Sequence, residues 1–336
     1  GVEHIKFNLW FLFDFRCALS PLSWVRYYLF GVCGLCLFIN GILYLLNSDT
    51  KTGKPEWIDT TETIVNPHNY SYILNRPEAC NTNTVLIMIV CTSMNNFGER
   101  EAIRNTWGAV GGDINSNITL LFLVGSGSSE DVQKQIFNES NHYRDIIQER
   151  FTDSYRNLSI KSQAMLKWIN SFCLTAKYAL KIDDDMYVNV PNLLKAVKKQ
   201  TIEKFILGHL FVNEHPVQDK KSKWYTPVKD FTEKTYPSYT SGTTYLMSVK
   251  AVPELYKTSL KTKLFWLEDI YITGLCARRA KIPRIHDSGF YVEKPTTTGC
   301  AYRNIITVWQ FGYIWKVEIS NLTRKIPDSP KNLMKS

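Results

Sequence analysis

The sequence predicts an α/β domain with a mainly parallel central sheet, preceded by one transmembrane helix. Two observations lead to this fold class. Continuous apolar runs rich in β-branched residues alternate with segments of helical spacing, which is typical of strand–helix–strand units. Near the N-terminus, residues 27–46 form a run of twenty residues without a charge. As a helix this run is about 30 Å long, which is the thickness of a bilayer core.

The composition excludes several classes of protein. The chain has 336 residues, of which 44% are hydrophobic and 21% charged, so a disordered chain, a collagen and a multi-span transporter are excluded. The net charge is +9, but the basic residues are spread along the chain in short clusters. No zinc-finger or RRM-type aromatic motif accompanies them, so we do not expect nucleic acid as a partner.

The N-terminal segments of the chain predict a membrane-anchored protein. Residues 1–26 are predicted to be a cytosolic tail, because Arg16 and Arg26 precede the apolar run and give a weak positive-inside bias. Residues 27–46 are the signal anchor, although a buried helix of a soluble core stays open as the alternative. Residues 47–79 have little apolar periodicity and are predicted to form a stem. Residues 80–325 form the lumenal domain, and 326–336 form a C-terminal tail.

Glycosylation sequons and cysteines agree with a lumenal body. The N-x-S/T sequons, a mild enrichment over chance, lie at Asn69, Asn117, Asn138, Asn157 and Asn321. The body contains five cysteines, so an oxidising compartment would allow two disulfides and one free thiol. Cys91 ends an apolar run and is therefore the candidate for the free thiol.

Within the body, strands and helices are predicted in alternation. We expect strands at 85–91, 118–124 and 178–182, and helices at 100–107, 129–147 and 161–177. In the last helix the apolar side chains fall on one stripe, which indicates packing against a core.

The third strand runs directly into Asp183-Asp184-Asp185. Three adjacent carboxylates repel one another unless something positive lies among them, and open α/β sheets bind ligands at the ends of such strands. A bound Mn²⁺ or Mg²⁺ would explain the cluster, while a solvated acidic turn is the alternative. A second acidic pair, Glu268-Asp269, follows an apolar segment that could raise a carboxyl pKa towards that of a general base. The alternative there is a pair of acids at a helix N-terminus.

Five sequence motifs occur in order along the body of the chain. They are REAIRNTWG at 100–108, FTDSYRNLSIK at 151–161, KIDDD at 181–185, YPSYTSG at 236–242 and EDIYITG at 268–274. In this order and spacing they resemble the β-1,3-galactosyltransferases and β-1,3-N-acetylglucosaminyltransferases of glycosyltransferase family 31. The resemblance covers about residues 80–317, and the single anchor and stem also match the Golgi type II layout of that family.

The resemblance implies a GT-A type, Rossmann-like domain that transfers galactose from UDP-galactose to the 3-hydroxyl of a terminal sugar on a glycoprotein or glycolipid. By that resemblance, Asp185 binds the metal, and Asp183 contacts the donor and flanks the same D-x-D motif, with Asp184 assisting. Inversion at the anomeric carbon needs a base, for which Asp269 is the first choice and Glu268 the second. Use of UDP-N-acetylglucosamine is the nearest alternative, and a catalytically weak sugar- or nucleotide-binding protein is another.

Other residues of these motifs have two interpretations each. Arg100 and Arg104 could meet the donor nucleotide, or they could pin their helix by ion pairs. Gly242 permits a close backbone approach near the sugar, although a tight turn would also explain it. Trp224 and Tyr245 offer flat faces for a sugar ring, but both could equally be core residues.

The sequence departs from the family pattern in its last segment. Trp309 stands where the family carries a metal-binding His, and Asn304 replaces another nearby His, so the third metal ligand would have to be water, His286 or Gln310. Thr240 stands where the family has a Cys. The resemblance and the cysteine count together suggest disulfides between Cys80 and Cys173 and between Cys276 and Cys300.

Overall fold

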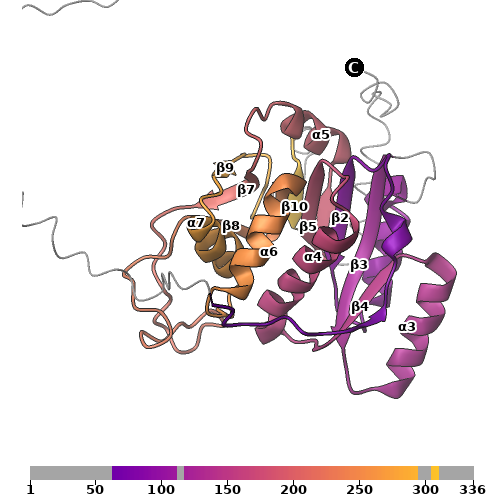
Figure 1. Ribbon diagram of the computed structural model, residues 1–336, viewed down its shortest axis with the longest axis horizontal. Coiled ribbons are helices and arrows are strands. Elements are labelled where there is room, and N and C mark those ends of the chain that lie inside the picture. The colour runs from indigo at the N-terminus through magenta and orange to yellow at the C-terminus, as the bar shows by residue number, and fades with distance from the viewer. Residues whose placement is uncertain (1–62, 112–116, 294–303, 310–336) are drawn as a thin grey trace, which may run out of the picture. The chain divides into compact units, whose positions relative to one another are not determined.

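The computed structural model describes residues 63–111, 117–293 and 304–309 (Figure 1). The strands are β1 Tyr72–Leu74, β2 Leu86–Cys91, β3 Ile118–Ser126, β4 Ile146–Thr152, β5 Tyr178–Asp183, β6 Met186–Val188, β7 Ile206–Phe211, β8 Tyr239–Ser248, β9 Arg284–His286 and β10 Thr307–Trp309. The α-helices are α2 Phe97–Arg104, α3 Glu130–Tyr143, α4 Leu158–Phe172, α5 Val190–Lys198, α6 Val252–Leu260 and α7 Ala277–Arg279. The short helices are η1 Pro77–Ala79, η2 Trp107–Gly111, η3 Tyr155–Asn157, η4 Val249–Ala251 and the π-helix η5 Ile270–Cys276.

The main sheet has eight strands in the order β1-β4-β3-β2-β5-β8-β7-β9, and β6 pairs with β10 in a separate two-stranded sheet. Strands β4, β3, β2 and β5 run parallel to one another, whereas β1 runs antiparallel to β4, and β8 runs antiparallel to both β5 and β7. The prediction of an α/β fold is therefore confirmed. The sheet is mixed, because its parallel half continues into antiparallel strands after β5.

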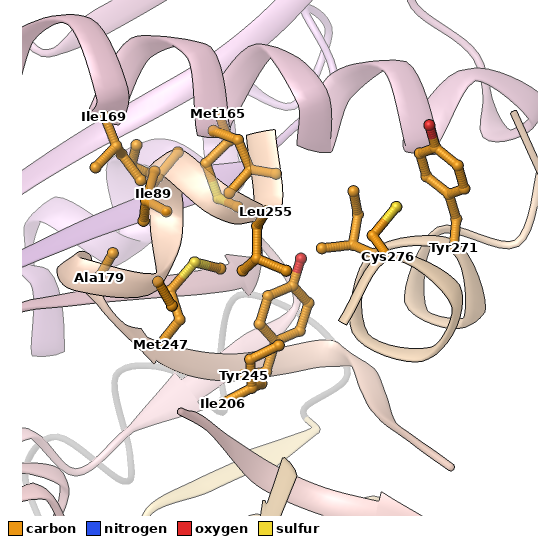
Figure 2. Close-up of a cluster of buried hydrophobic side chains, with 14 of the residues drawn as sticks. Ile89, Met165, Ile169, Ala179, Ile206, Tyr245, Met247, Leu255, Tyr271 and Cys276 are labelled. Carbon is orange, nitrogen blue, oxygen red and sulfur yellow. The ribbon is translucent and has the colours of Figure 1, made fainter. Parts of the chain in front are cut away.

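Two apolar layers cover the sheet. On one face, α4 and α6 lie side by side (Figure 1), and their side chains form one core cluster with strand residues and η5. Figure 2 shows Met165 and Ile169 of α4 beside Ile89 of β2, with Leu255 of α6 in the same cluster. Residues of α2, α3, α5 and β6 form the second cluster. Both faces of β2 are covered, so all six of its residues are buried, as the continuous apolar run predicts.

The predicted elements appear in the predicted order, with one clear error. The three predicted strands correspond to β2, β3 and β5, and the three predicted helices to α2, α3 and α4. The second predicted helix, at 129–147, ends at Tyr143, and its last residues begin β4. Arg144 adopts a left-handed conformation with φ 56° that ends the helix. Most residues of β4 are buried, so apolar and polar side chains do not alternate along it as they do in a surface strand.

Part of the segment assigned to a stem belongs to the folded domain. β1 pairs antiparallel with β4, and Asn66 donates through its side chain to the carbonyls of Ser259 and Thr262. His68 is buried, and its Nε2 lies 2.6 Å from a carboxylate oxygen of Glu149. The domain therefore starts before residue 80, because these earlier residues have partners in its core.

The cysteines agree with prediction in two of three respects. Cys80 and Cys173 form a disulfide, and Cys91 is a buried free thiol. The predicted bond between Cys276 and Cys300 is not formed: Cys276 is a buried free thiol that lies with Tyr271 and Leu255 in the core (Figure 2), and Cys300 lies outside the described residues.

The predicted membrane anchor, residues 27–46, also lies outside the described residues. Within the described part of the chain, no helix combines the length and the apolar character needed to cross a membrane.

Candidate functional site

The three adjacent aspartates lie at the point where the strand order reverses. β3 pairs with one side of β2 and β5 with the other, and Cys91 at the end of β2 lies opposite Asp183 at the end of β5. In open α/β sheets, the loops that leave such a point diverge and open a crevice at the carboxyl ends of the strands. Asp183 ends β5 at this point and is followed by Asp184 and Asp185, so the three carboxylates lie where that rule expects a ligand.

The second acidic pair lies at the same place. Glu268 and Asp269 immediately precede η5, and a Cβ atom added at Gly242 of β8 would lie 3.1 Å from both the Cβ of Asp269 and Oε2 of Glu268. Such contacts are tighter than ordinary van der Waals distance, so the absence of a side chain at Gly242 lets β8 approach the acidic pair. The structure thus gives Gly242 a role in bringing β8 close to the acidic pair, and its approach to the sugar stays a prediction.

A buried lysine joins the two acidic segments. Lys181 Nζ lies 2.5 Å from Oδ1 of Asp183 and 3.8 Å from Oε2 of Glu268, and it also donates to the carbonyl oxygen of Gly242. The Lys181 side chain is only 4% exposed. Burial alone would lower its pKa, but the carboxylates of Asp183 and Glu268 outweigh this effect and hold the pKa above its usual value. The lysine therefore stays charged and balances the two carboxylates.

Glu268 has a different environment from its neighbour. Its Oε1 accepts hydrogen bonds from the Ser162 hydroxyl at 2.7 Å and the Tyr245 hydroxyl at 2.6 Å, and its Oε2 faces Lys181. These partners belong to α4, β8 and β5, so the carboxylate of Glu268 ties three elements together. Tyr245 is fully buried in this contact and offers no face to a sugar ring.

Asp269 is the more exposed of the two and has the pKa of a general base. Burial and the charge of Glu268 raise the pKa of Asp269 to about 6, while the backbone N–H groups of Ile270 and Gly242 and the charge of Lys181 oppose the increase. The Oδ1 atom accepts from the Ile270 N–H at 2.8 Å. A carboxyl group with this pKa is deprotonated at neutral pH yet basic enough to accept a proton.

Asp184 turns away from the lysine towards the loop after β2. Its Oδ2 accepts from the Thr92 hydroxyl at 2.5 Å and from the Asn96 side-chain amide at 2.8 Å. That loop is fixed in turn by Lys161 of α4, which donates to the carbonyl oxygen of Thr92 and forms an ion pair with Asp153 at 2.7 Å. Loops following β2, β4 and β5 are thus held in one arrangement.

Asp185 contacts the residue that replaces the expected histidine. β10 pairs antiparallel with β6, which places Trp309 opposite Met186, and the Trp309 indole N–H donates to Oδ2 of Asp185 at 2.7 Å. The other oxygen of Asp185, Oδ1, is buried and has no hydrogen-bond partner among the described residues. Burial raises the pKa of Asp185, and the indole contact opposes this.

The donor set fits a cation only in part. A buried carboxylate oxygen without a partner is a suitable hard ligand, and Asp183 is a second, with 34% of its side chain exposed. The described part of the chain contains no group of three or more His, Cys, Asp or Glu residues placed to hold a metal ion. His286 lies on β9 and accepts from the Leu210 N–H, and Gln310 lies outside the described residues. A cation here would complete its coordination from a substrate or from water.

The two motif arginines follow their structural interpretation. Arg100 is fully buried, donates twice to Glu139 of α3 and also donates to two carbonyls of the loop after β2. Arg104 donates to Asp145 and Glu139 at 2.7 to 2.9 Å. Their donors are directed at α3, Asp145 and the loop, as the interpretation by ion pairs expects, and a contact with the donor nucleotide stays a prediction. Arg100 instead fixes the loop that carries the partners of Asp184.

The sequons differ in accessibility. Asn69 and Asn138 are exposed, whereas Asn117 and Asn157 are half-buried, and Asn321 lies outside the described residues. The Asn157 side-chain amide donates to the carbonyl oxygen of Thr152 at 2.8 Å.

Sequence reasoning missed the lysine at the centre of the site. Lys181 is an isolated charge in an otherwise apolar strand, and a charge in such a strand must have partners if it is buried. That signal could have identified it. Thr92 and Asn96 follow a buried strand and could have been found by the same rule that identified the aspartates.

Comparison with known proteins places this site in a family. The sequence model described as galactosyltransferase matches residues 98–288. The chain is 37% identical over 250 residues to a Homo sapiens protein named "Beta-1,3-galactosyltransferase 1", covering 73% of this chain and 76% of that protein. It is 35% identical over 277 residues to a Mus musculus protein named "Lactosylceramide 1,3-N-acetyl-beta-D-glucosaminyltransferase", covering 79% and 72%.

Proposed function

The chain belongs to the galactosyltransferase family, and from this premise we propose that it moves galactose from UDP-galactose to the 3-hydroxyl of a terminal sugar on a glycoprotein or glycolipid. The observation that carries the proposal is the convergence of Asp183 and Glu268-Asp269 around Lys181 and Gly242. A carboxyl group with the pKa of a base and a second acidic cluster at one crevice are the groups that such a transfer requires. The domain is expected to be of the GT-A type.

The reaction is a single displacement. Asp269 accepts the proton of the acceptor 3-hydroxyl, and the freed oxygen lone pair forms a bond to the anomeric carbon. The bond from that carbon to the UDP oxygen breaks, and its electron pair leaves with the diphosphate. UDP-galactose is α-linked, so attack from the opposite face gives the β-1,3 linkage.

The other residues of the site orient these groups. Glu268 fixes the segment that carries Asp269 through Ser162 and Tyr245, and acts as a positioning residue. Lys181 holds Asp183 at the end of β5, where Asp183 would meet the ribose or the sugar of the donor. Asp184 fixes the loop after β2 through Thr92.

A divalent cation, Mn²⁺ or Mg²⁺, would be held by Asp185 through its unpartnered Oδ1, with Asp183 as the second protein ligand. When bound, such a cation supplies positive charge that stabilises the departing diphosphate. Trp309 occupies the other oxygen of Asp185, so the protein supplies few ligands and we expect weak metal binding that depends on the nucleotide.

A panel of donors and acceptors tests the proposed activity. The lumenal domain is incubated with UDP-galactose or UDP-N-acetylglucosamine and with simple β-linked acceptors, with and without Mn²⁺. We expect a β-1,3-galactosylated product, identified by NMR. Transfer only from UDP-N-acetylglucosamine would support the alternative donor, which the name of the Mus musculus relative suggests. Nucleotide binding without transfer to any acceptor would support a catalytically weak binding protein instead.

The metal assignment predicts a selective loss in Asp185→Asn. We expect the Mn²⁺-dependent part of UDP binding to fall at least tenfold, since an amide oxygen is a poorer ligand than a carboxylate. Calorimetric titration of UDP with and without Mn²⁺ measures it. The matched control is Asp131→Asn on the exposed surface of α3, which should change nothing. Unchanged Mn²⁺-dependent UDP binding in Asp185→Asn would show that the ion is held elsewhere.

The proposed location is the Golgi membrane, with residues 27–46 as a single type II anchor and the domain in the lumen. Two features support an oxidising lumen. The Cys80–Cys173 disulfide is of a kind that persists in secretory compartments, and the sequon residues Asn69 and Asn138 are exposed.

A further inference from the structure

Three aromatic side chains gather beside the proposed base. Tyr155 of η3 is 48% exposed, and Trp224 of the loop between β7 and β8 is 49% exposed. Their exposure is notable because aromatic rings carry a large apolar surface that is usually buried. Trp266 is half-buried, and its ring centroid lies 6.3 Å from that of Tyr155. The Lys223 ammonium lies 4.6 Å from the centroid of the Trp224 ring and 6.0 Å from that of the Tyr155 ring, so these two rings lie near one another. The three residues come from separate segments of the chain.

Contacts beneath the rings tie this group to the acidic pair. Trp266 precedes Asp269 by three residues, and the Ser159 hydroxyl of α4 donates to the carbonyl oxygen of Phe265 at 2.5 Å. One turn further along α4, Ser162 donates to Glu268. The helix that starts just after Tyr155 is therefore fixed along the segment that carries Trp266 and Asp269.

The loop that carries Trp224 is also anchored on this segment. Phe231 and Tyr236 of the loop are buried and pack on Phe265, with ring centroids 5.7 and 6.1 Å from it. Arg278 of α7 holds Glu233 of the same loop through two hydrogen bonds of 2.9 and 2.8 Å. Trp224 is thus exposed on a loop whose following segment is fixed to the core.

Two cations flank the aromatic rings. The Arg156 guanidinium lies 3.8 Å from the centroid of the Trp266 ring, and the Lys223 ammonium lies 4.6 Å from that of Trp224. Each cation lies over one face of its ring, and such contacts hold the rings in place. Both cations carry N–H groups that can donate to the hydroxyl groups of a sugar beside them.

We propose that Tyr155, Trp224 and Trp266 form an acceptor platform on which the terminal sugar of the acceptor stacks, with its 3-hydroxyl towards Asp269. The inference rests on the proposed function. The matching ligand is a neutral pyranose that presents a continuous C–H face to the rings and hydroxyl groups to Lys223. β-Galactosides have this form, because the axial 4-hydroxyl leaves the opposite face of C3, C4 and C5 apolar.

The test separates sugar binding from transfer. Saturation-transfer NMR with methyl β-galactoside and methyl β-N-acetylglucosaminide measures binding without turnover, and acceptor KM is measured with the p-nitrophenyl β-glycosides. We expect Trp224→Ala and Tyr155→Ala to raise the acceptor KM at least tenfold and to abolish the NMR contact. Acceptor-independent hydrolysis of UDP-galactose and UDP binding should stay within twofold of wild type. Trp224→Phe should restore most of the acceptor affinity.

The matched control is Phe137→Ala. Phe137 is also an exposed aromatic residue, at 39%, but it lies on α3, a helix that contributes no residue to the platform. This variant should leave the acceptor KM unchanged. An acceptor KM within twofold of wild type in both platform variants would overturn the platform, as would the absence of any NMR contact in the wild type. Sugar binding that depends on Trp224 without transfer from any donor would instead overturn the proposed function and leave the platform standing.

Discussion

Replacement of Asp269 by Asn is expected to lower kcat by about 10²–10⁴-fold, which is the usual contribution of a general base. The amide cannot accept the acceptor proton, but its oxygen can still accept the hydrogen bond from the Ile270 N–H that begins η5. Folding and UDP binding should therefore be preserved. Steady-state kinetics measures the loss, and calorimetric titration with UDP measures the retained affinity.

The dependence of kcat/KM on pH should also show the ionisation of Asp269. The pKa of Asp269 is raised to about 6, chiefly by burial and by the charge of Glu268. A base must be deprotonated to act, so kcat/KM should fall about tenfold per pH unit below this value and level off above it. This acidic limb should be absent in Asp269→Asn. Retention of the limb would assign the base to another group.

Glu268→Gln separates the two carboxylates. An amide can still accept from Ser162 and Tyr245 through its oxygen, but it loses the charge that faces Lys181. We expect a smaller loss of kcat than in Asp269→Asn and an acidic limb shifted to lower pH, because removing a neighbouring negative charge lowers the pKa of Asp269. A larger loss than in Asp269→Asn would make Glu268 the base.

Replacement of Lys181 by Met is expected to have the largest effect on stability. It leaves the carboxylates of Asp183 and Glu268 without their shared cation and the carbonyl of Gly242 without its donor. Breaking a buried pair costs about 3–5 kcal/mol, and we expect the lower end because Asp183 is a third exposed. Denaturant unfolding measures the free energy of unfolding, and UDP binding should weaken along with it.

The matched substitution is Lys250→Met. Lys250 forms an ion pair with Glu203 at 2.5 Å, but both side chains are about two-thirds exposed, so solvent already screens the pair. Its thermal unfolding temperature should match that of wild type. If Lys181→Met were equally stable, the two acidic segments would not depend on the lysine for their arrangement.

The strands β2 and β3 could be predicted because each is covered on both faces and so appears as a continuous run of mainly apolar residues, and β5 shows the same kind of run interrupted by Lys181. β4 could not be separated from the helix before it, since two isoleucines at its start fit either period. The antiparallel half of the sheet was missed because its pairings join segments far apart in sequence. Tyr239 pairs with Phe211, for example, across the loop that carries Trp224.

By itself, the sequence determined the α/β class and the positions of both acidic segments, whereas the Cys80–Cys173 disulfide was one of several possible pairings until the structure showed it. The fold class and the acidic segments could be predicted because apolar periodicity and sequence motifs depend only on residues that are close together in the sequence. Only the tertiary structure decided that Lys181 joins the acidic segments, that Arg100 supports a loop, and that Trp224 lies near Tyr155. These relations depend on which strands become neighbours, and no short stretch of the chain contains that information.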